Sequence, residues 1–261
     1  MKKGNKIAEF YKSLGRPAGD FCLERRQQDV LFDEKWLRFV KLSGLFRHLP
    51  FVEFVFGAGS MALGNVNQNS DFDVIVGVKS GRIWTTRFFC ILAFDLIGRR
   101  RKKLSHKEEA SNKFCFNHFV SLKSYCLRPP YNVYWQELYR NLVPIYGRKE
   151  KIQEFFKANG WAGLRHAEAG SGLAKAGEQI YSDDLRHRIY GPSFLGIFME
   201  KILTGRIGDF TEKVLRKIQI QRIEKGLKDG LGFEPRLFFN DDELEFHPDT
   251  LRINKLVSDE R

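Results

Sequence analysis

The sequence has few cysteines, and its cysteines and histidines form no cluster. The four cysteines lie far apart without a Cys-x-x-Cys pair: Cys22, Cys90, Cys115 and Cys126. The six histidines are also scattered. This spacing matches no zinc-binding pattern, and unclustered cysteines in a chain of 261 residues are typical of reduced thiols. We therefore expect a cytoplasmic protein without a disulfide framework.

Long apolar runs are also lacking. The most apolar stretch, Phe88 to Ile97, has about half of the ~20 residues that span a bilayer, and it contains Asp95. The basic N-terminal residues 1–15 have no apolar run behind them, so they are not typical of a signal peptide. The sequence predicts a protein with no membrane partner.

Acidic residues are in the minority. The chain has 44 Lys and Arg against 32 Asp and Glu, and residues 79–128 alone contain twelve basic and three acidic residues. This excess favours polyanionic partners such as nucleotides or nucleic acid. Two interpretations of the basic run at 99–103 stay open. It holds a nucleic-acid backbone or a triphosphate, or it is the solvated C-terminal end of a helix, where the dipole favours positive charge.

Helix and strand patterns predict an α+β fold with a small mixed sheet and flanking helices. Apolar residues recur at helical spacing over 33–48. Short β-rich runs at 51–56, 71–78 and 113–122 predict strands, and 81–96 predicts a loop that leads into a helix.

A proline pair at 129–130 predicts a domain boundary. Beyond it, helical patterns dominate, residues 162–177 are rich in Gly and Ala, and 236–247 predicts a hairpin with an acidic turn. The predicted organisation is a polar leader at 1–20, a first domain at 21–128, and a mainly helical region at 129–261 with a loose linker at 162–177.

Two motifs one strand–helix–strand unit apart are the most informative feature. Asp71 and Asp73 begin a strand, and alternation places both carboxylates on one face, where they repel each other unless a cation neutralises them. Mg²⁺ prefers oxygen ligands, so a pair of Mg²⁺ ions is the expected neutraliser. Gly59 and Ser60 lie where a strand turns into a helix, and backbone N–H groups at such a turn can hold phosphate oxygens.

At these residues the chain resembles the polymerase-beta-like nucleotidyltransferase superfamily. Its signature is an apolar strand, Gly-Ser, a gap of roughly ten residues, and Asp-x-Asp leading a second strand; the four matching positions are Gly59, Ser60, Asp71 and Asp73. The pattern at 59–64 is most similar to the minimal nucleotidyltransferases, and 81–88 resembles uncharacterised prokaryotic members. The resemblance covers 33–128. It implies that Asp71 and Asp73 bind Mg²⁺ and that Gly59 and Ser60 hold the β- and γ-phosphates of a nucleoside triphosphate.

One position departs from the family pattern. The superfamily usually places a third carboxylate on the next strand, where it activates the attacking hydroxyl, and we expect Asn117 at that position in this chain. An amide cannot accept a proton, so Asn117 cannot serve as the base that activates the attacking hydroxyl. Strand alternation predicts that Asn117 shares a face with Cys115 and Phe119, and that His118 faces the other way.

Four further residues are candidates for nucleotide or acceptor binding. Directly after the second strand, at a predicted helix start, lie Arg82, Thr85, Thr86 and Arg87. They either contact phosphates near the aspartates, or a threonine simply caps the helix. Asp95, inside an apolar helical run, is predicted to be the structural partner of a basic side chain.

The function predicted from these residues is Mg²⁺-dependent transfer of a nucleoside monophosphate from a triphosphate to a hydroxyl, with release of pyrophosphate. The acceptor can be a protein, an RNA end or a small molecule, and the oligomeric state is left open. One alternative is a catalytically degenerate protein that binds a nucleotide or nucleic acid. Another is an antitoxin-like regulator that modifies or masks a partner protein.

Overall fold

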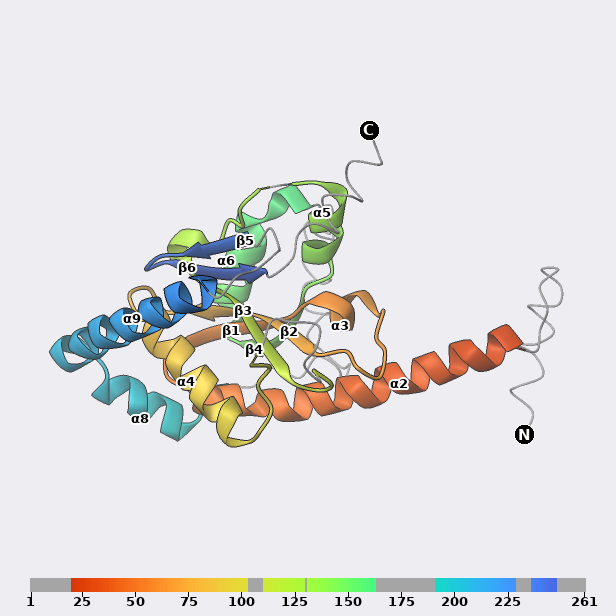
Figure 1. Cartoon of the computed structure of the whole chain (residues 1–261), viewed down its shortest axis with the longest axis horizontal. Coiled ribbons are helices and arrows are strands. Elements are labelled where there is room, and N and C mark those ends of the chain that lie inside the picture. The colour runs from red at the N-terminus through yellow and green to blue at the C-terminus, as the bar shows by residue number, and fades with distance from the viewer. Residues whose placement is uncertain (1–19, 103–109, 130, 163–190, 229–235, 248–261) are drawn as a thin grey trace.

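The computed structural model describes residues 20–102, 110–129, 131–162, 191–228 and 236–247. It confirms the α+β class, with helices packed on both faces of one mixed sheet (Figure 1). The strands are β1 (Val52–Gly57), β2 (Phe72–Val78), β3 (Phe114–Ser121), β4 (Val143–Gly147), β5 (Arg236–Phe239) and β6 (Glu243–His247). The helices are α2 (Asp20–Ser43), α3 (Gly59–Leu63), α4 (Ile83–Leu96), α5 (Val133–Arg140), α6 (Lys149–Ala158), α8 (Phe194–Ile202) and α9 (Gly205–Lys228).

The sheet has the order β4-β1-β2-β3-β6-β5. The β2–β3 pair is parallel, because α4 carries the chain back between them, and each other neighbouring pair is antiparallel. The ends of β2 and β3 that come first in the chain therefore meet at the same edge of the sheet. This edge receives Asp71 and Asp73.

Alternation along the strands divides the core into two clusters. One face of β2 contributes Phe72, Val74 and Val76 to a cluster that packs under α2, α4 and α9. The opposite face contributes Ile75, which packs with side chains of α5 and α6 such as Trp135 and Phe155. Figure 1 shows α2 and α4 on one side of the sheet and α5 and α6 on the other.

The predicted domain boundary at 129 is wrong for the sheet. Strand β4 pairs with β1, and the β5–β6 hairpin pairs with β3, so three strands from 129–261 complete a sheet begun by 21–128. The predicted hairpin at 236–247 is confirmed. Except for Asp20, at the start of α2, and Ala162, the predicted leader at 1–20 and linker at 162–177 lie outside the described residues.

A β-bulge in β3 changes which side chains share a face. Asp73 pairs with Cys115, whereas Ile75 pairs with His118, so two residues of β3 oppose Val74. The extra residue reverses the alternation from that point. The predicted faces are therefore wrong beyond Asn117: Phe119 packs in the cluster under α2 and α4, and His118 joins the face of Ile75.

None of the helices in the described ranges combines the length and apolar character needed to cross a membrane.

Candidate functional site

The two aspartates lie together at the edge where β2 begins. Asp71 directly precedes β2, Asp73 is its second residue, and the backbone N–H of Ala58 donates to the carbonyl of Asp73 at 2.9 Å. Ligand atoms of Asp71, Asp73 and Cys115 all lie within 4.8 Å of one another. The predicted pairing of the carboxylates on one face is therefore present in the fold, and β3 adds a buried thiol.

Gly59 lets the chain turn tightly above Asp73. Its φ is +59°, in the left-handed region that favours glycine. A Cβ at this position would lie 2.9 Å from the carboxyl carbon of Asp73 and closer still to its Oδ2. The glycine is thus required both by the backbone conformation and by the approach of α3 to the carboxylate.

We expect Gly59→Ala to weaken triphosphate binding, because the added methyl group must displace the Asp73 carboxylate. The left-handed conformation should also cost about 1–2 kcal/mol of stability. Gly64→Ala is the matched control: Gly64 has φ +73°, but a Cβ there would have no heavy atom within 4 Å. Thermal unfolding of both variants measures the cost of the left-handed backbone conformation, which they share. A nucleotide titration measures the effect of displacing the Asp73 carboxylate, which only Gly59→Ala should show. Equal triphosphate affinity in the two variants would show that this close approach is irrelevant to binding.

The carboxylate pair is electrostatically strained. Burial, and next the neighbouring charge of Asp71, raise the pKa of Asp73 to about 7, while Arg101 and Cys115 oppose the rise. Two carboxylates held side by side favour protonation of one of them, or a bound cation. The site is therefore suited to a positively charged ligand.

Arg101 already supplies one positive charge, and sequence reasoning did not single it out. Its Nη1 lies 2.7 Å from Oδ2 of Asp71, and both side chains are largely buried. The segment after α4 is held there by backbone hydrogen bonds, because Arg101 N–H donates to Phe114 O and Phe114 N–H donates to Arg99 O. The basic run at 99–103 was the available signal, and part of it lies at the candidate site.

Lys35 of α2 also fixes the segment that leads into the site. Its Nζ donates to the carbonyl of Ser70 at 3.0 Å and to Oδ1 of Asn112 at 3.3 Å. Burial lowers the pKa of Lys35, with a further lowering by Arg38, while Asp71 opposes the shift. A buried lysine thus holds the residue immediately before Asp71.

Asn117 lies beside the aspartates, as expected. Its Nδ2 is 3.4 Å from Oδ1 of Asp73, and it is one of the two β3 residues that oppose Val74 at the bulge. No other carboxylate joins the group of Asp71, Asp73 and Cys115 in the part of the chain that the structure describes. The position where a third acid was expected is therefore occupied by an amide.

Arg82, Thr85, Thr86 and Arg87 are not brought to this site. The aspartates lie where β2 begins, whereas these four residues follow Val78, where β2 ends. The prediction that they lie near the aspartates is therefore wrong. The prediction relied on the short distance along the chain between these residues and the aspartates. An extended strand of seven residues nevertheless separates its two ends by about 20 Å.

Side chains of α9 occupy this other edge instead. The pairs are Arg82 with Asp209 (2.6 Å), the N–H groups of Trp84 and Thr85 with Glu212 (2.9 Å each), and Arg87 with Gln219 (2.6 Å). A carboxylate at a helix N-terminus satisfies free N–H groups and the helix dipole. Glu212 therefore caps α4, a role that the sequence had suggested for a threonine.

The interpretation of Asp95 is confirmed. Its Oδ2 lies 2.9 Å from Nε of Arg100, and its Oδ1 lies 3.9 Å from Nζ of Lys102. This pairing uses part of the basic run for structure, close to where Arg101 contacts Asp71.

No family model, curated protein or solved structure matches this chain. The resemblance to polymerase-beta-like nucleotidyltransferases therefore stays a prediction, based on Gly59, Ser60, Asp71 and Asp73.

Proposed function

We propose that the protein is a Mg²⁺-dependent nucleotidyltransferase that moves a nucleoside monophosphate from a triphosphate to a hydroxyl acceptor and releases pyrophosphate. The observation that supports this most directly is the convergence of Asp71, Asp73 and the Gly59 turn at one sheet edge. Carboxylates on one strand face, next to free N–H groups at a helix start, suit a metal–triphosphate complex.

The donor chemistry at this edge fits Mg²⁺. The mutual repulsion of Asp71 and Asp73 favours a divalent cation, and carboxylate oxygens are the ligands that Mg²⁺ prefers. Cys115 is a soft ligand that does not suit Mg²⁺, so we assign the metal to the two aspartates. When bound, Mg²⁺ would neutralise the triphosphate and stabilise the attacking and leaving oxygens.

The remaining residues of the site would orient the substrate. Gly59 and Ser60 begin α3, and the first N–H groups of a helix have no partner within it. They would donate to the β- and γ-phosphates. Arg101 adds positive charge beside the carboxylates, and Asn117 would position the acceptor through its amide rather than take its proton.

A nucleotide- or nucleic-acid-binding protein without turnover is the second candidate. Two observations favour it: the amide of Asn117 lies where a base is needed, and Arg101 gives Asp71 a permanent counter-charge. Such a site retains the phosphate-binding elements and lacks a group that removes the acceptor's proton.

A paired assay distinguishes the two candidates. The protein is incubated with Mg²⁺, each of the four ribonucleoside triphosphates labelled at the α-phosphate, and three acceptors: itself, an RNA oligonucleotide, and small polyols. We expect pyrophosphate release together with label transfer, and neither with EDTA. Triphosphate binding by calorimetry without pyrophosphate release would support the degenerate binding protein. Absence of both binding and release would reject the assignment of this site to nucleotides.

A further inference from the structure

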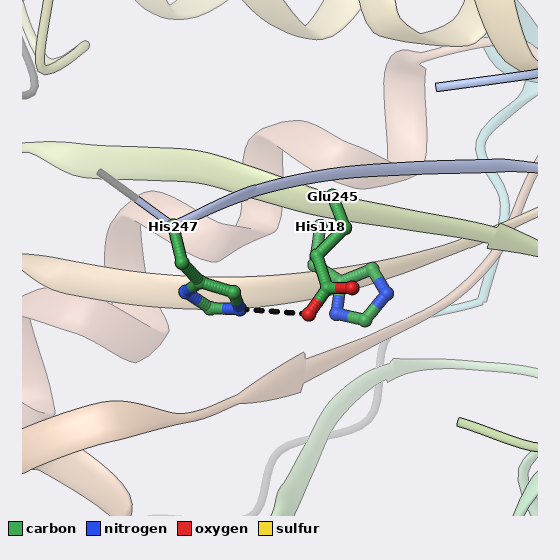
Figure 2. Close-up of side chains that lie close together, drawn as sticks. All are labelled: His118, Glu245 and His247. Atoms are coloured by element: carbon green, nitrogen blue, oxygen red, sulfur yellow. Dashed lines mark ion pairs between the residues drawn. The ribbon is translucent and has the colours of Figure 1, made fainter. Parts of the chain in front are cut away.

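A second cluster of ligand-type side chains lies outside the aspartate site. Strand β6 alternates, so Leu244 and Phe246 enter the core under α2 and α4, while Glu245 and His247 face the other way. His118 of β3 pairs directly with Glu245 across the antiparallel ladder. The bulge in β3 therefore brings His118, Glu245 and His247 together on one face, as Figure 2 shows.

These three side chains are close enough to share one ion. Their ligand atoms lie within 4.8 Å of one another, and Nε2 of His247 is 3.1 Å from Oε1 of Glu245. At zinc–ligand distances of about 2.0–2.1 Å, tetrahedral ligands lie about 3.3 Å apart, so small side-chain rotations suffice. Two imidazoles and one carboxylate are a ligand set that Zn²⁺ prefers and Mg²⁺ does not.

The Glu245 carboxylate points to a missing ligand. The residue is completely buried, and its Oε2 makes no hydrogen bond within the described ranges. Oε1 is 2.8 Å from Nε of Arg236, so that ion pair balances the charge but leaves the second oxygen unsatisfied. An unsatisfied buried carboxylate oxygen is unfavourable, and metal coordination is one way to satisfy it.

The surroundings also orient the imidazole of His118. Its Nε2 lies 3.3 Å from Oε1 of Glu243, and Oε2 of Glu243 lies 2.6 Å from Nε of Arg128. With Nε2 engaged by Glu243, Nδ1 is the nitrogen left for a metal. A carboxylate that accepts from the second nitrogen of a histidine is the usual support for a metal-bound imidazole.

We infer that His118, Glu245 and His247 form a Zn²⁺ site that joins the β5–β6 hairpin to β3. Three ligands from two strands cross-link elements that are more than 120 residues apart in the chain. Because β3 also contains Asn117, the metal would stabilise the strand that borders the aspartates. The inference does not depend on the proposed nucleotidyltransferase activity.

Metal binding to the purified chain of 261 residues tests this inference. The protein is stripped with chelator, desalted, and titrated with Zn²⁺ against a chromophoric competitor. We expect one equivalent to bind and the unfolding temperature to rise, because a ligand that binds only the folded state stabilises it. Co²⁺ should bind with visible absorption but without thiolate charge transfer, because the ligands are nitrogen and oxygen. Failure of Zn²⁺ to bind or to raise the unfolding temperature would overturn the inference.

Matched variants locate the ion. Glu245→Gln and His247→Gln should each weaken Zn²⁺ binding by more than about 100-fold. Loss of a residue that only hydrogen-bonds to a metal ligand already lowers metal affinity by about 10–100-fold. His48→Gln, at a histidine bonded to Ser193 outside the cluster, should bind as the wild type does. Cys115→Ser removes the thiol of the other candidate metal group, Asp71, Asp73 and Cys115. If Cys115→Ser abolishes Zn²⁺ binding while both glutamine variants retain it, the assignment is overturned. The His247 variant keeps the test valid if Glu245→Gln does not fold, because His247 is partly exposed.

Discussion

Asp73→Asn is expected to abolish Mg²⁺-dependent triphosphate binding. The substitution removes the negative charge that lies under the Gly59 turn, and an amide oxygen is a much weaker ligand for Mg²⁺ than a carboxylate. Calorimetric titration with a non-hydrolysable triphosphate, with and without Mg²⁺, measures the effect. Asp29→Asn, at an exposed residue of α2, is the control with the same charge change. If Asp73→Asn retains the wild-type affinity, the proposed metal ligand is wrong.

The same variant should be more stable than the wild type when no metal is present. The pKa of Asp73 rises from its ordinary 3.8 to about 7 in the folded protein, so ionisation disfavours the folded state. This destabilisation grows as the pH rises between these two values and is complete above the higher one. In EDTA, the unfolding temperature of Asp73→Asn should be higher than that of the wild type at about pH 8, and the two should be nearly equal at about pH 4. If Asp73→Asn is less stable than the wild type at the higher pH, the conclusion that ionised Asp73 destabilises the folded protein is wrong.

Asn117→Asp is expected to raise the rate of nucleotidyl transfer. The side chain at 117 already lies 3.4 Å from the Asp73 carboxylate, so the new acid would stand beside the proposed metal ligand, where the proposed reaction requires a base. General base catalysis typically contributes ~10²–10⁴-fold. Pyrophosphate release under saturating Mg²⁺ and triphosphate measures the gain.

Two comparisons make the Asn117 result interpretable. Gln221→Glu adds one negative charge at an exposed residue of α9 and should leave the transfer rate unchanged. Without Mg²⁺, Asn117→Asp should lower the unfolding temperature, because a third carboxylate joins two that already repel each other. If the wild type transfers rapidly and Asn117→Asp slows it, Asn117 itself contributes to the reaction and another group removes the proton.

The location of the candidate site followed from local patterns. Asp71 and Asp73 share a face because strand side chains alternate, and Gly59 begins α3 at a position where only a residue without a side chain fits. Both effects act over a few residues, so spacing along the chain is sufficient to predict them. The α+β class followed in the same way from the helical and strand periods.

The sequence spacing could not show what long-range pairing would bring to each edge. Arg82 comes only a few residues after β2, yet it contacts Asp209 and not the aspartates. The seven extended residues of β2 separate the edge where Arg82 lies from the edge where the aspartates lie. Arg101 comes much later and nevertheless contacts Asp71, because α4 returns the chain to the starting edge. Distance along the chain was therefore a poor guide to which basic residues border the carboxylates.

The sequence by itself determined the local elements: the glycine turn, the adjacent carboxylates, the amide of Asn117 and the hairpin at 236–247. Only the tertiary structure decided that this hairpin completes the sheet, and that a single extra residue in β3 reverses its faces. A bulge depends on how two strands pair, and sheet order depends on contacts across the whole chain, so neither leaves a periodic signal in the sequence. The meeting of His118 with Glu245 arises from both of these long-range pairings.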